Sequence, residues 1–260
     1  MLRVGTLELG SVPRIAAALT DADVHAHADA VRRFADIAEL RIDQFARRDP
    51  AHVVEMCRAA GALGLPIIAT VRAANEGGGT ALDDAQRLAL FEAVAPLVAA
   101  LDIELRAPIC DRVVALAQQH GRLAIVSHHD FAATPADADL AALFDAAALA
   151  DADVIKIAAH AASPADTDRL IGFLRARRER GLIVIAMGPH GVASRVFFPL
   201  LGSLITYASA GDAMAPGQLS LTDLHAELRR YSPEFADAHP GVRDEQFTTR
   251  PTKSTKKARL

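Results

Sequence analysis

Short apolar runs rich in β-branched residues alternate with longer stretches in which apolar residues recur at helical spacing. The short runs predict eight β-strands, and the longer stretches predict helices between them. We expect the strands at residues 14–19, 37–43, 66–72, 101–105, 123–131, 153–160, 182–187 and 204–208. Clear helical stretches are expected at residues 50–63, 81–99, 108–120, 135–150 and 164–180. Several of these begin near a proline and stop at a glycine, as at Gly61, Gly121 and Gly181.

The alternation of strands and helices determines the fold class that we expect. Eight strand–helix units in about 230 residues are typical of an α/β protein with a (β/α)8 TIM barrel. An open doubly wound sheet is the alternative, but no Gly-x-Gly-x-x-Gly motif follows the first expected strand. No domain boundary is visible, so residues 1–231 are predicted to form a single barrel. Residues 232–260 are polar and basic without apolar periodicity, which predicts a disordered C-terminal tail.

Charged residues fall on one face of several expected strands. Successive strand residues point to opposite faces of a sheet, so residues two apart share a face. The polar sets that share a face in this way are Glu39, Arg41 and Asp43; Thr70 and Arg72; Asp102 and Glu104; and Ser127 and His129. In a barrel, the apolar faces pack on the helices and these side chains point inward, toward the mouth where barrel enzymes hold their active sites. A purely structural barrel would fill its interior with Val, Ile and Leu, so this pattern predicts a functional site.

Lys156 lies in the middle of the apolar strand Asp153-Val-Ile-Lys-Ile-Ala158. Lysine is almost never fully buried without a reason. Desolvation favours the neutral amine, which is a nucleophile that can form a Schiff base with a ketone. The plainer interpretation is a lysine near a strand end whose amine reaches water. Taken alone, Lys156 favours the plainer interpretation.

Composition and charge exclude several classes of protein. The chain has 260 residues, of which 51% are hydrophobic, and a formal net charge of −4, which gives no reason to expect a nucleic-acid or membrane-surface partner. No apolar run approaches the ~18 residues of a membrane span, and the N-terminus does not resemble a signal peptide. Cys57 and Cys110 show neither metal-ligand nor disulfide spacing, which is typical of a cytoplasmic protein. We therefore expect a cytoplasmic protein without a metal site.

Each polar candidate also has a structural explanation. Arg41 could pair with Glu39 or Asp43, and Arg72 could be a surface group at a strand end. His129, beside His128, could be a hydrogen-bonded core histidine. The stretch Glu76-Gly-Gly-Gly79 could be a flexible loop, and Arg195 an ordinary helix residue. No single candidate establishes a site.

Seven motifs in order resemble those of the type I 3-dehydroquinate dehydratases, over roughly residues 14–230. They are Glu39-Leu-Arg-Ile-Asp43, Thr70-Val-Arg-Ala-Ala-Asn-Glu-Gly-Gly78, Ser127-His-His-Asp-Phe131, Asp153-Val-Ile-Lys-Ile-Ala158, Gly191-Val-Ala-Ser-Arg195, Gly202-Ser203 and Ala215-Pro-Gly-Gln218. Any one of them is weak, but seven in order are specific. The resemblance implies the same (β/α)8 barrel that the periodicity predicts. It also implies the dehydration of 3-dehydroquinate to 3-dehydroshikimate in the shikimate pathway.

The resemblance implies a role for each candidate residue. Lys156 would form an imine with the substrate ketone, and His129 would move protons as general base and then general acid. Glu76 would orient His129. The substrate-binding residues implied in the same way are Arg195 and Gln218 for the carboxylate, and Glu39, Arg41 and Arg72 for the ring hydroxyls. The resemblance implies neither a metal nor an organic cofactor. Members of the family are often dimeric, so it also implies a possible homodimer.

Two positions depart from the family pattern, and two other functions stay open. Met214 and Ala18 stand where many members have serines that help to hold the substrate carboxylate. His190, in an individual loop, has no role that we can derive. One alternative is a Schiff-base aldolase or transaldolase on the same barrel, which usually has a phosphate site. The other is a barrel that binds a metabolite without catalysis. The retained set of Lys156, His129 and Glu76 favours the dehydratase over that sensor.

Overall fold

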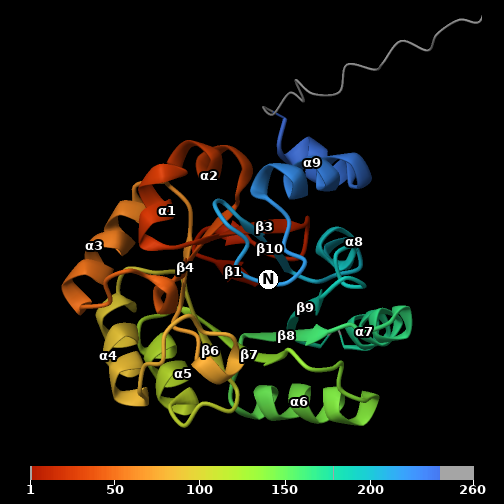
Figure 1. The fold of residues 1–260 in the computed structure, drawn as a ribbon, viewed down its shortest axis with the longest axis horizontal. Helices are drawn as coiled ribbons and strands as arrows, with labels where there is room; N and C mark the ends of the chain where they lie inside the picture. The colour runs from red at the N-terminus through yellow and green to blue at the C-terminus, as the bar shows by residue number, and fades with distance from the viewer. Residues whose placement is uncertain (1, 178, 241–260) are drawn as a thin grey trace, which may run out of the picture.

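A ring of eight parallel strands forms the centre of the computed structural model, which describes residues 2–177 and 179–240. The order across the sheet is β10-β3-β4-β5-β6-β7-β8-β9, and each neighbouring pair in that order is parallel. The strands are β3 (Arg14–Leu19), β4 (Ile37–Arg41), β5 (Ile67–Thr70), β6 (Ala100–Glu104), β7 (Leu123–Asp130), β8 (Val154–His160), β9 (Gly181–Met187) and β10 (Ile205–Ser209). Figure 1 shows the helices around this ring. The predicted (β/α)8 barrel is confirmed.

The two edge strands of the sheet, β9 and β10, close the barrel with few contacts. One backbone hydrogen bond joins them directly, from Leu204 N to Leu182 O at 2.9 Å. The hydroxyl of Ser203 adds a second link, because its Oγ accepts from Val184 N at 3.0 Å and contacts Val184 O at 3.4 Å. The Ser203 side chain therefore replaces part of the backbone hydrogen bonding between β9 and β10, and the barrel is nearly closed.

Helices cover the outside of the strands and bury the apolar strand faces. They are α1 (Asp21–Ala26), α2 (Ala28–Phe34), α3 (Pro50–Gly61), α4 (Asp84–Val94), α5 (Cys110–Gln119), α6 (Asp137–Leu149), α7 (Pro164–Ala176), α8 (Ser194–Leu200), α9 (Leu221–Tyr231) and α10 (Pro233–Ala238). Two short 3-10 turns, η1 (Ile42–Gln44) and η2 (Ala74–Glu76), follow β4 and β5. Local sequence explains the helix starts: Asp49 caps α3 with Pro50 in its first turn, and Asp83 and Gln86 form a capping box on α4.

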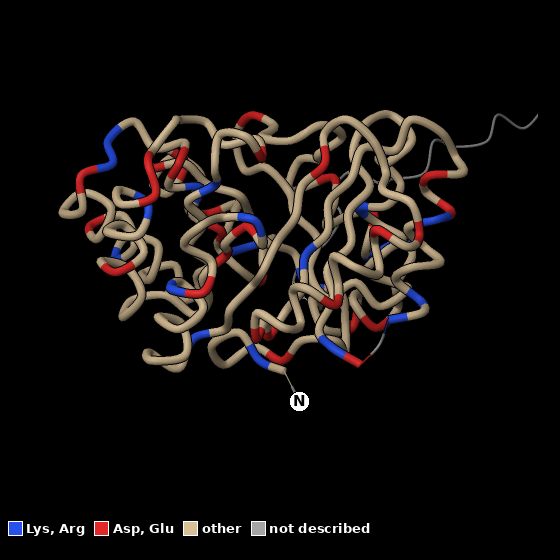
Figure 2. Tube along the Cα trace, turned by 90° about the horizontal axis from the view of Figure 1, so that it is seen from below, with Lys and Arg blue, Asp and Glu red and all other residues tan. Residues whose placement is uncertain are grey.

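A small N-terminal hairpin plugs the end of the barrel opposite the site. Its strands β1 (Arg3–Val4) and β2 (Leu7–Glu8) are antiparallel. Val4 is fully buried and belongs to the same apolar cluster as the inward residues at the strand starts, such as Ile37, Ile68 and Val154. The barrel interior at the strand starts is thus apolar, and the inward charged side chains lie nearer the carboxyl ends of the strands. Figure 2 shows basic and acidic positions interspersed along the chain, with neither sign confined to one side.

Several boundaries differ from the expectation; the expected helix 81–99, for example, spans Asp84–Val94. The second strand ends at Arg41 because the chain turns into η1, which lets Asp43 bond to the next strand end. The expected helix 164–180 ends at Ala176, and Gly181 begins β9 instead of stopping a helix. The expected tail from residue 232 begins with α10, whose Phe235 is fully buried. Residues 241–260 lie outside the described residues. No described helix is long and apolar enough to cross a membrane.

Candidate active site

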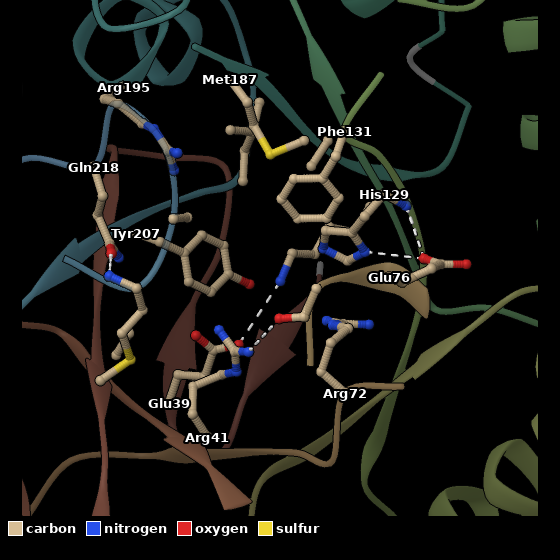
Figure 3. A pocket seen from close by; sticks show the side chains of 17 residues that line it. Glu39, Arg41, Arg72, Glu76, His129, Phe131, Met187, Arg195, Tyr207 and Gln218 are labelled. Carbon is tan, nitrogen blue, oxygen red and sulfur yellow. Dashed lines mark hydrogen bonds and ion pairs between the residues drawn. The ribbon is translucent and has the colours of Figure 1, made fainter. Parts of the chain in front are cut away.

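A pocket opens at the carboxyl ends of the strands and is lined by polar and apolar side chains. It brings together every candidate site residue that the sequence predicts. Those residues are Glu39, Arg41, Arg72, Glu76, His129, Lys156, Arg195 and Gln218. Ala18, Phe131, Met187, Tyr207 and Met214 also line it, and Figure 3 shows most of these side chains pointing toward a common space. Inward charges on successive strands thus converge as the residue parity predicts.

Lys156 points from the middle of β8 into the pocket and is only 4% exposed. Its Nζ donates to Asp102 Oδ2 at 2.9 Å and lies 3.7 Å from Glu39 Oε1. The ring of Tyr207 lies against the same amine, with its centroid 4.1 Å from Nζ. The plainer interpretation, a lysine whose amine reaches water, is wrong. The amine is instead held by two carboxylates and an aromatic face inside the barrel.

A network of buried charges lies beneath Lys156. Arg72 donates to Asp102 and Glu104, both at 2.8 Å, and to Ser127 Oγ at 2.6 Å. Arg87 donates to the other oxygen of Glu104. Burial raises the pKa of Asp102, but the charges of Arg72 and Lys156 outweigh it and hold this pKa well below its ordinary value. Asp102 is therefore a carboxylate that fixes both cations.

Glu76 and His129 form a hydrogen-bonded pair at the mouth of the pocket. Glu76 Oε2 accepts from the backbone N of His129 at 2.8 Å and lies 3.2 Å from its Nδ1. Burial raises the pKa of Glu76, but the nearby His128 and the hydrogen bond with His129 lower it to about 2. Burial and then the charge of Arg72 lower the pKa of His129 to about 3. At neutral pH the pair is thus a carboxylate beside a neutral imidazole, whose Nδ1–H faces Glu76 and whose Nε2 carries the free lone pair.

Close packing holds the loop that carries Glu76 in place. Gly77 has φ +84°, and a Cβ there would lie 2.5 Å from the ring of Phe131. A Cβ on Gly78 would lie 2.2 Å from the carbonyl oxygen of Arg72. Gly79 donates its N–H to Asp43 Oδ2 at 3.0 Å. The positive φ of Gly77 and the close approach of Gly78 to the Arg72 carbonyl require glycine, so the run is a tightly packed turn and not a flexible loop.

Arg195 enters the pocket from the start of α8 and is 3% exposed. Ser194 fastens this turn to β9, since its Oγ accepts from Ala186 N and donates to Ala186 O, both at 3.1 Å. The Arg195 guanidinium donates to Pro216 O at 3.3 Å, and its Nε has no partner among the described residues. Burial lowers the pKa of Arg195 to about 10, so it stays charged at neutral pH. This is a buried cation without a carboxylate among the described residues.

Gln218 and Arg41 differ in how free their polar groups are. Gln218 Oε1 accepts from Met214 N at 2.8 Å, which leaves its amide NH2 as a donor toward the pocket. Arg41 instead forms a two-point ion pair with Asp43, at 3.1 and 2.8 Å. This is one of the two structural pairings that the sequence allowed for Arg41. Both residues line the pocket, but Arg41 directs Nε and Nη2 to Asp43, whereas the whole amide NH2 of Gln218 remains as a donor.

The model of the type I 3-dehydroquinase family matches residues 15–232 of the chain. The chain belongs to this family. The 3-dehydroquinate dehydratase of Methanococcoides burtonii is 35% identical over 230 residues, which cover 86% of this chain and 97% of that protein. The crystal structure of the Aquifex aeolicus 3-dehydroquinate dehydratase has 31% identity, a TM-score of 0.76, and covers 85% of this chain and 99% of that one.

A third relative is the type I 3-dehydroquinate dehydratase of Clostridium difficile, with 25% identity and a TM-score of 0.82, covering 88% of this chain and 97% of that one. The predicted family, fold and activity are confirmed: the chain is a type I 3-dehydroquinase, a hydro-lyase of the shikimate pathway whose mechanism uses a lysine Schiff base. The aldolase and sensor alternatives are therefore set aside.

Two residues of this type I 3-dehydroquinase site received no role from the sequence. Asp102 carries the ion pair to Lys156, and its inward parity was visible without an assigned partner. Tyr207 was not singled out, although it shares the inward face of β10 with Ile205, whose strand was predicted. A strand-by-strand search for inward polar atoms would have found both.

Proposed function

We propose that the pocket binds 3-dehydroquinate and that Lys156 forms the imine with its ketone. The observation that carries this is the position of Lys156, which is the only lysine before residue 253 and lies buried in the pocket. Imine formation converts an ammonium and a ketone into a protonated imine and one water, so the charge at Nζ is the same before and after. The carboxylates of Asp102 and Glu39 that hold the ammonium therefore also suit the protonated imine.

His129 is the proton carrier in this proposal. A protonated imine withdraws electrons and acidifies the adjacent C–H bond. Because His129 is neutral above about pH 3, its free Nε2 is ready to take that proton at neutral pH. The imidazolium so formed then returns the proton to the departing hydroxyl, which leaves as water. One residue thus serves as base and as acid.

Glu76 acts through His129. Its carboxylate accepts from Nδ1, which fixes the tautomer and stabilises the imidazolium once it forms. The tight Gly77–Gly79 turn supports this orientation, because it fixes the loop that carries Glu76. Glu76 is therefore a positioning residue that carries no proton itself.

Arg195 and Gln218 would bind the substrate carboxylate. Arg195 is a buried cation without a carboxylate among the described residues, whereas Arg41, Arg72 and Lys156 each have one within 4 Å. A guanidinium fork and an amide donor suit a planar carboxylate. The substrate carboxylate would give Arg195 the anionic partner that it lacks among the described residues.

Glu39, Arg41 and Arg72 are proposed to contact the ring hydroxyls. Glu39 already accepts from Thr70 Oγ1 at 2.8 Å but keeps further lone pairs. Arg41 and Arg72 direct most of their donors to carboxylates of the protein, so only their remaining N–H groups would reach the substrate. The C. difficile relative was solved with covalently modified comenic acid, and covalent attachment of a small molecule to a relative supports adduct formation here. The reaction as proposed uses no metal and no organic cofactor.

Borohydride trapping tests this proposal. Reducing the enzyme in the presence of 3-dehydroquinate should leave a permanent adduct on Lys156, identified by peptide mass. Lys156→Ala should give no adduct and almost no turnover. His129→Ala should still be trapped, yet turn over orders of magnitude more slowly, because imine formation depends on the amine and elimination depends on the base.

Glu76→Gln is the matched variant for the positioning role. It should keep the adduct and lose only part of the rate. Trapping at one of the lysines beyond residue 252, or full turnover in Lys156→Ala, would remove Lys156 from the mechanism. A cytoplasmic location and a homodimer are also proposed for this enzyme, and sedimentation of the purified chain tests the second.

A further inference from the structure

Tyr207 is a buried polar residue of the pocket to which the proposed mechanism assigns no role. It lies on β10, its side chain is 4% exposed, and its hydroxyl has no hydrogen-bond partner among the described residues. Leaving a buried hydroxyl without a partner costs stability, and Phe would fill the same space without that cost. A hydroxyl kept at this position therefore points to an acceptor that arrives with the substrate.

The neighbouring carboxylates accept from other donors, and neither bonds to the Tyr207 hydroxyl. Glu39 accepts from Thr70 Oγ1 at 2.8 Å. Asp102 accepts from Lys156, Arg72 and Ser127, at 2.9, 2.8 and 2.7 Å. Burial raises the pKa of Tyr207 well above its ordinary value, and the same two carboxylates raise it further. The hydroxyl thus keeps its proton and can act as a hydrogen-bond donor.

The position of the ring indicates which substrate oxygen it serves. Nζ of Lys156 lies over the ring of Tyr207, 4.1 Å from its centroid, so the phenol borders any group bound to that nitrogen. His129 comes from β7, on another wall of the pocket, and Figure 3 shows the two rings facing the cavity from different sides. Arg195 and Gln218 are assigned to the carboxylate. Tyr207 remains as the free donor beside the atom that Lys156 attacks.

We propose that the Tyr207 hydroxyl donates a hydrogen bond to the substrate ketone oxygen while Lys156 forms and hydrolyses the imine. This inference rests on the proposed role of Lys156. In the forward step the Nζ–carbon bond forms and the carbonyl π pair moves onto the oxygen. That oxygen then leaves as water with two protons that the ammonium gives up, and the positive charge stays on the nitrogen. Tyr207 stabilises the developing negative charge on the oxygen and loses no proton.

Time-resolved trapping of Tyr207→Phe tests the proposal. Enzyme and 3-dehydroquinate are mixed, borohydride is added at successive times, and the adduct on Lys156 is measured by peptide mass. The variant should form the adduct at least about tenfold more slowly than the unchanged enzyme, a loss of ~1.4 kcal/mol. Its thermal midpoint should be equal or higher, because no protein partner is lost. Tyr231→Phe is the matched control, since Tyr231 is 48% exposed and lies outside the pocket lining.

The outcomes separate this inference from the mechanism on which it rests. An adduct rate within about twofold of the unchanged enzyme, with trapping still on Lys156, would overturn the role of Tyr207 alone. A lowered thermal midpoint would assign the hydroxyl to a structural partner and would also overturn it. Failure of the unchanged enzyme to be trapped on Lys156 would instead remove the Schiff-base assignment. His129→Ala gives the opposite signature, with rapid trapping and slow turnover.

Discussion

Among single residues, the distribution of charge distinguishes Arg195 from the other cations of the pocket. Arg72 contacts Asp102 and Glu104, and Lys156 contacts Asp102, so their charges are balanced before substrate binds. Arg195 is equally buried, yet among the described residues it contacts a carbonyl oxygen and no carboxylate. Arg195 is therefore a buried cation that lacks a carboxylate partner among the described residues, which favours an anionic substrate group at this position.

Arg195→Ala should therefore lower kcat/KM by well over tenfold. Loss of a buried charge partner typically costs ~2–5 kcal/mol, and Met214 brings no hydroxyl to replace it. Steady-state kinetics followed by the absorbance of the conjugated product give the value. The kcat/KM of Arg195→Lys should lie between those of Arg195→Ala and the unchanged enzyme, because lysine keeps the charge but cannot donate two parallel hydrogen bonds. Arg112→Ala, at an exposed position of α5, is the control. A loss smaller than about tenfold would show that Arg195 is not the carboxylate anchor.

The sequence predicted which residues share the pocket but not how they pair. Strand parity alone placed Glu39, Arg72 and His129 on inward faces, because the side-chain period of a strand is fixed by its geometry, whereas Lys156 gained its role only from the family resemblance. Parity could not show that Lys156 bonds to Asp102, 54 positions earlier. Such pairs depend on the stagger between neighbouring strands, which is set by packing around the whole barrel. The free hydroxyl of Tyr207 is visible only once all its neighbours are known.

Among the elements, strands were predicted better than the short segments between them. Each expected strand overlaps a strand of the sheet, because every strand buries an apolar face against the helices and so keeps apolar residues at alternate positions. The 3-10 turns η1 and η2 were missed, although they carry Asp43 and Glu76. Three-residue turns leave no periodicity in a sequence, and their conformation follows from contacts made elsewhere. The tail boundary at residue 232 failed for a similar reason, since α10 has only one buried apolar side chain.

Helix α10 is held to the barrel by an ion pair that depends on pH. His239 Nδ1 contacts Phe235 O at 2.9 Å, and its Nε2 lies 3.1 Å from Asp36 Oδ1. The hydrogen bond with Asp36 raises the pKa of His239 above its ordinary 6.5, although Arg14, which also pairs with Asp36, opposes this. A raised pKa in the folded state means that the stabilisation is complete below about pH 6.5. It is lost as the pH rises through the folded-state pKa.

His239→Gln should therefore lower the thermal midpoint more at pH 6 than at pH 8.5. A difference of about 2–4 °C is expected, the shift that ~1 kcal/mol gives in a chain of this size. Thermal denaturation of both proteins across this pH range provides the measurement. His25→Gln, at an exposed position of α1, should show no such trend. An equal loss at both pH values would mean that the ring acts only by stacking on Phe235, 4.1 Å away.

In the whole molecule, the two ends of the barrel differ in composition: one is apolar and closed by the N-terminal hairpin, and the other carries the charged pocket. The N-terminal hairpin and the apolar layer above it form a rigid floor, and the charged layers rest on that floor. The β9–β10 junction is the weakest part of the ring, with one direct backbone bond and the bridge from Ser203. Arg195 lies in α8, between β9 and β10 in the chain, and Tyr207 lies in β10. We therefore expect the position of the proposed carboxylate site relative to Lys156 to depend on the closure that Ser203 completes.

The segment beyond the barrel provides the last prediction. Residues 248–260 lie outside the described residues, and their polar sequence has no apolar periodicity to pack on a barrel. Their deletion should leave the thermal midpoint and kcat unchanged, as measured by denaturation and steady-state kinetics. The deletion also removes Lys253, Lys256 and Lys257, so that Lys156 is the only lysine left. Borohydride trapping of the shortened chain should then give one adduct in undiminished yield. A lower midpoint or a reduced kcat would show that the segment docks on the barrel or on a second subunit.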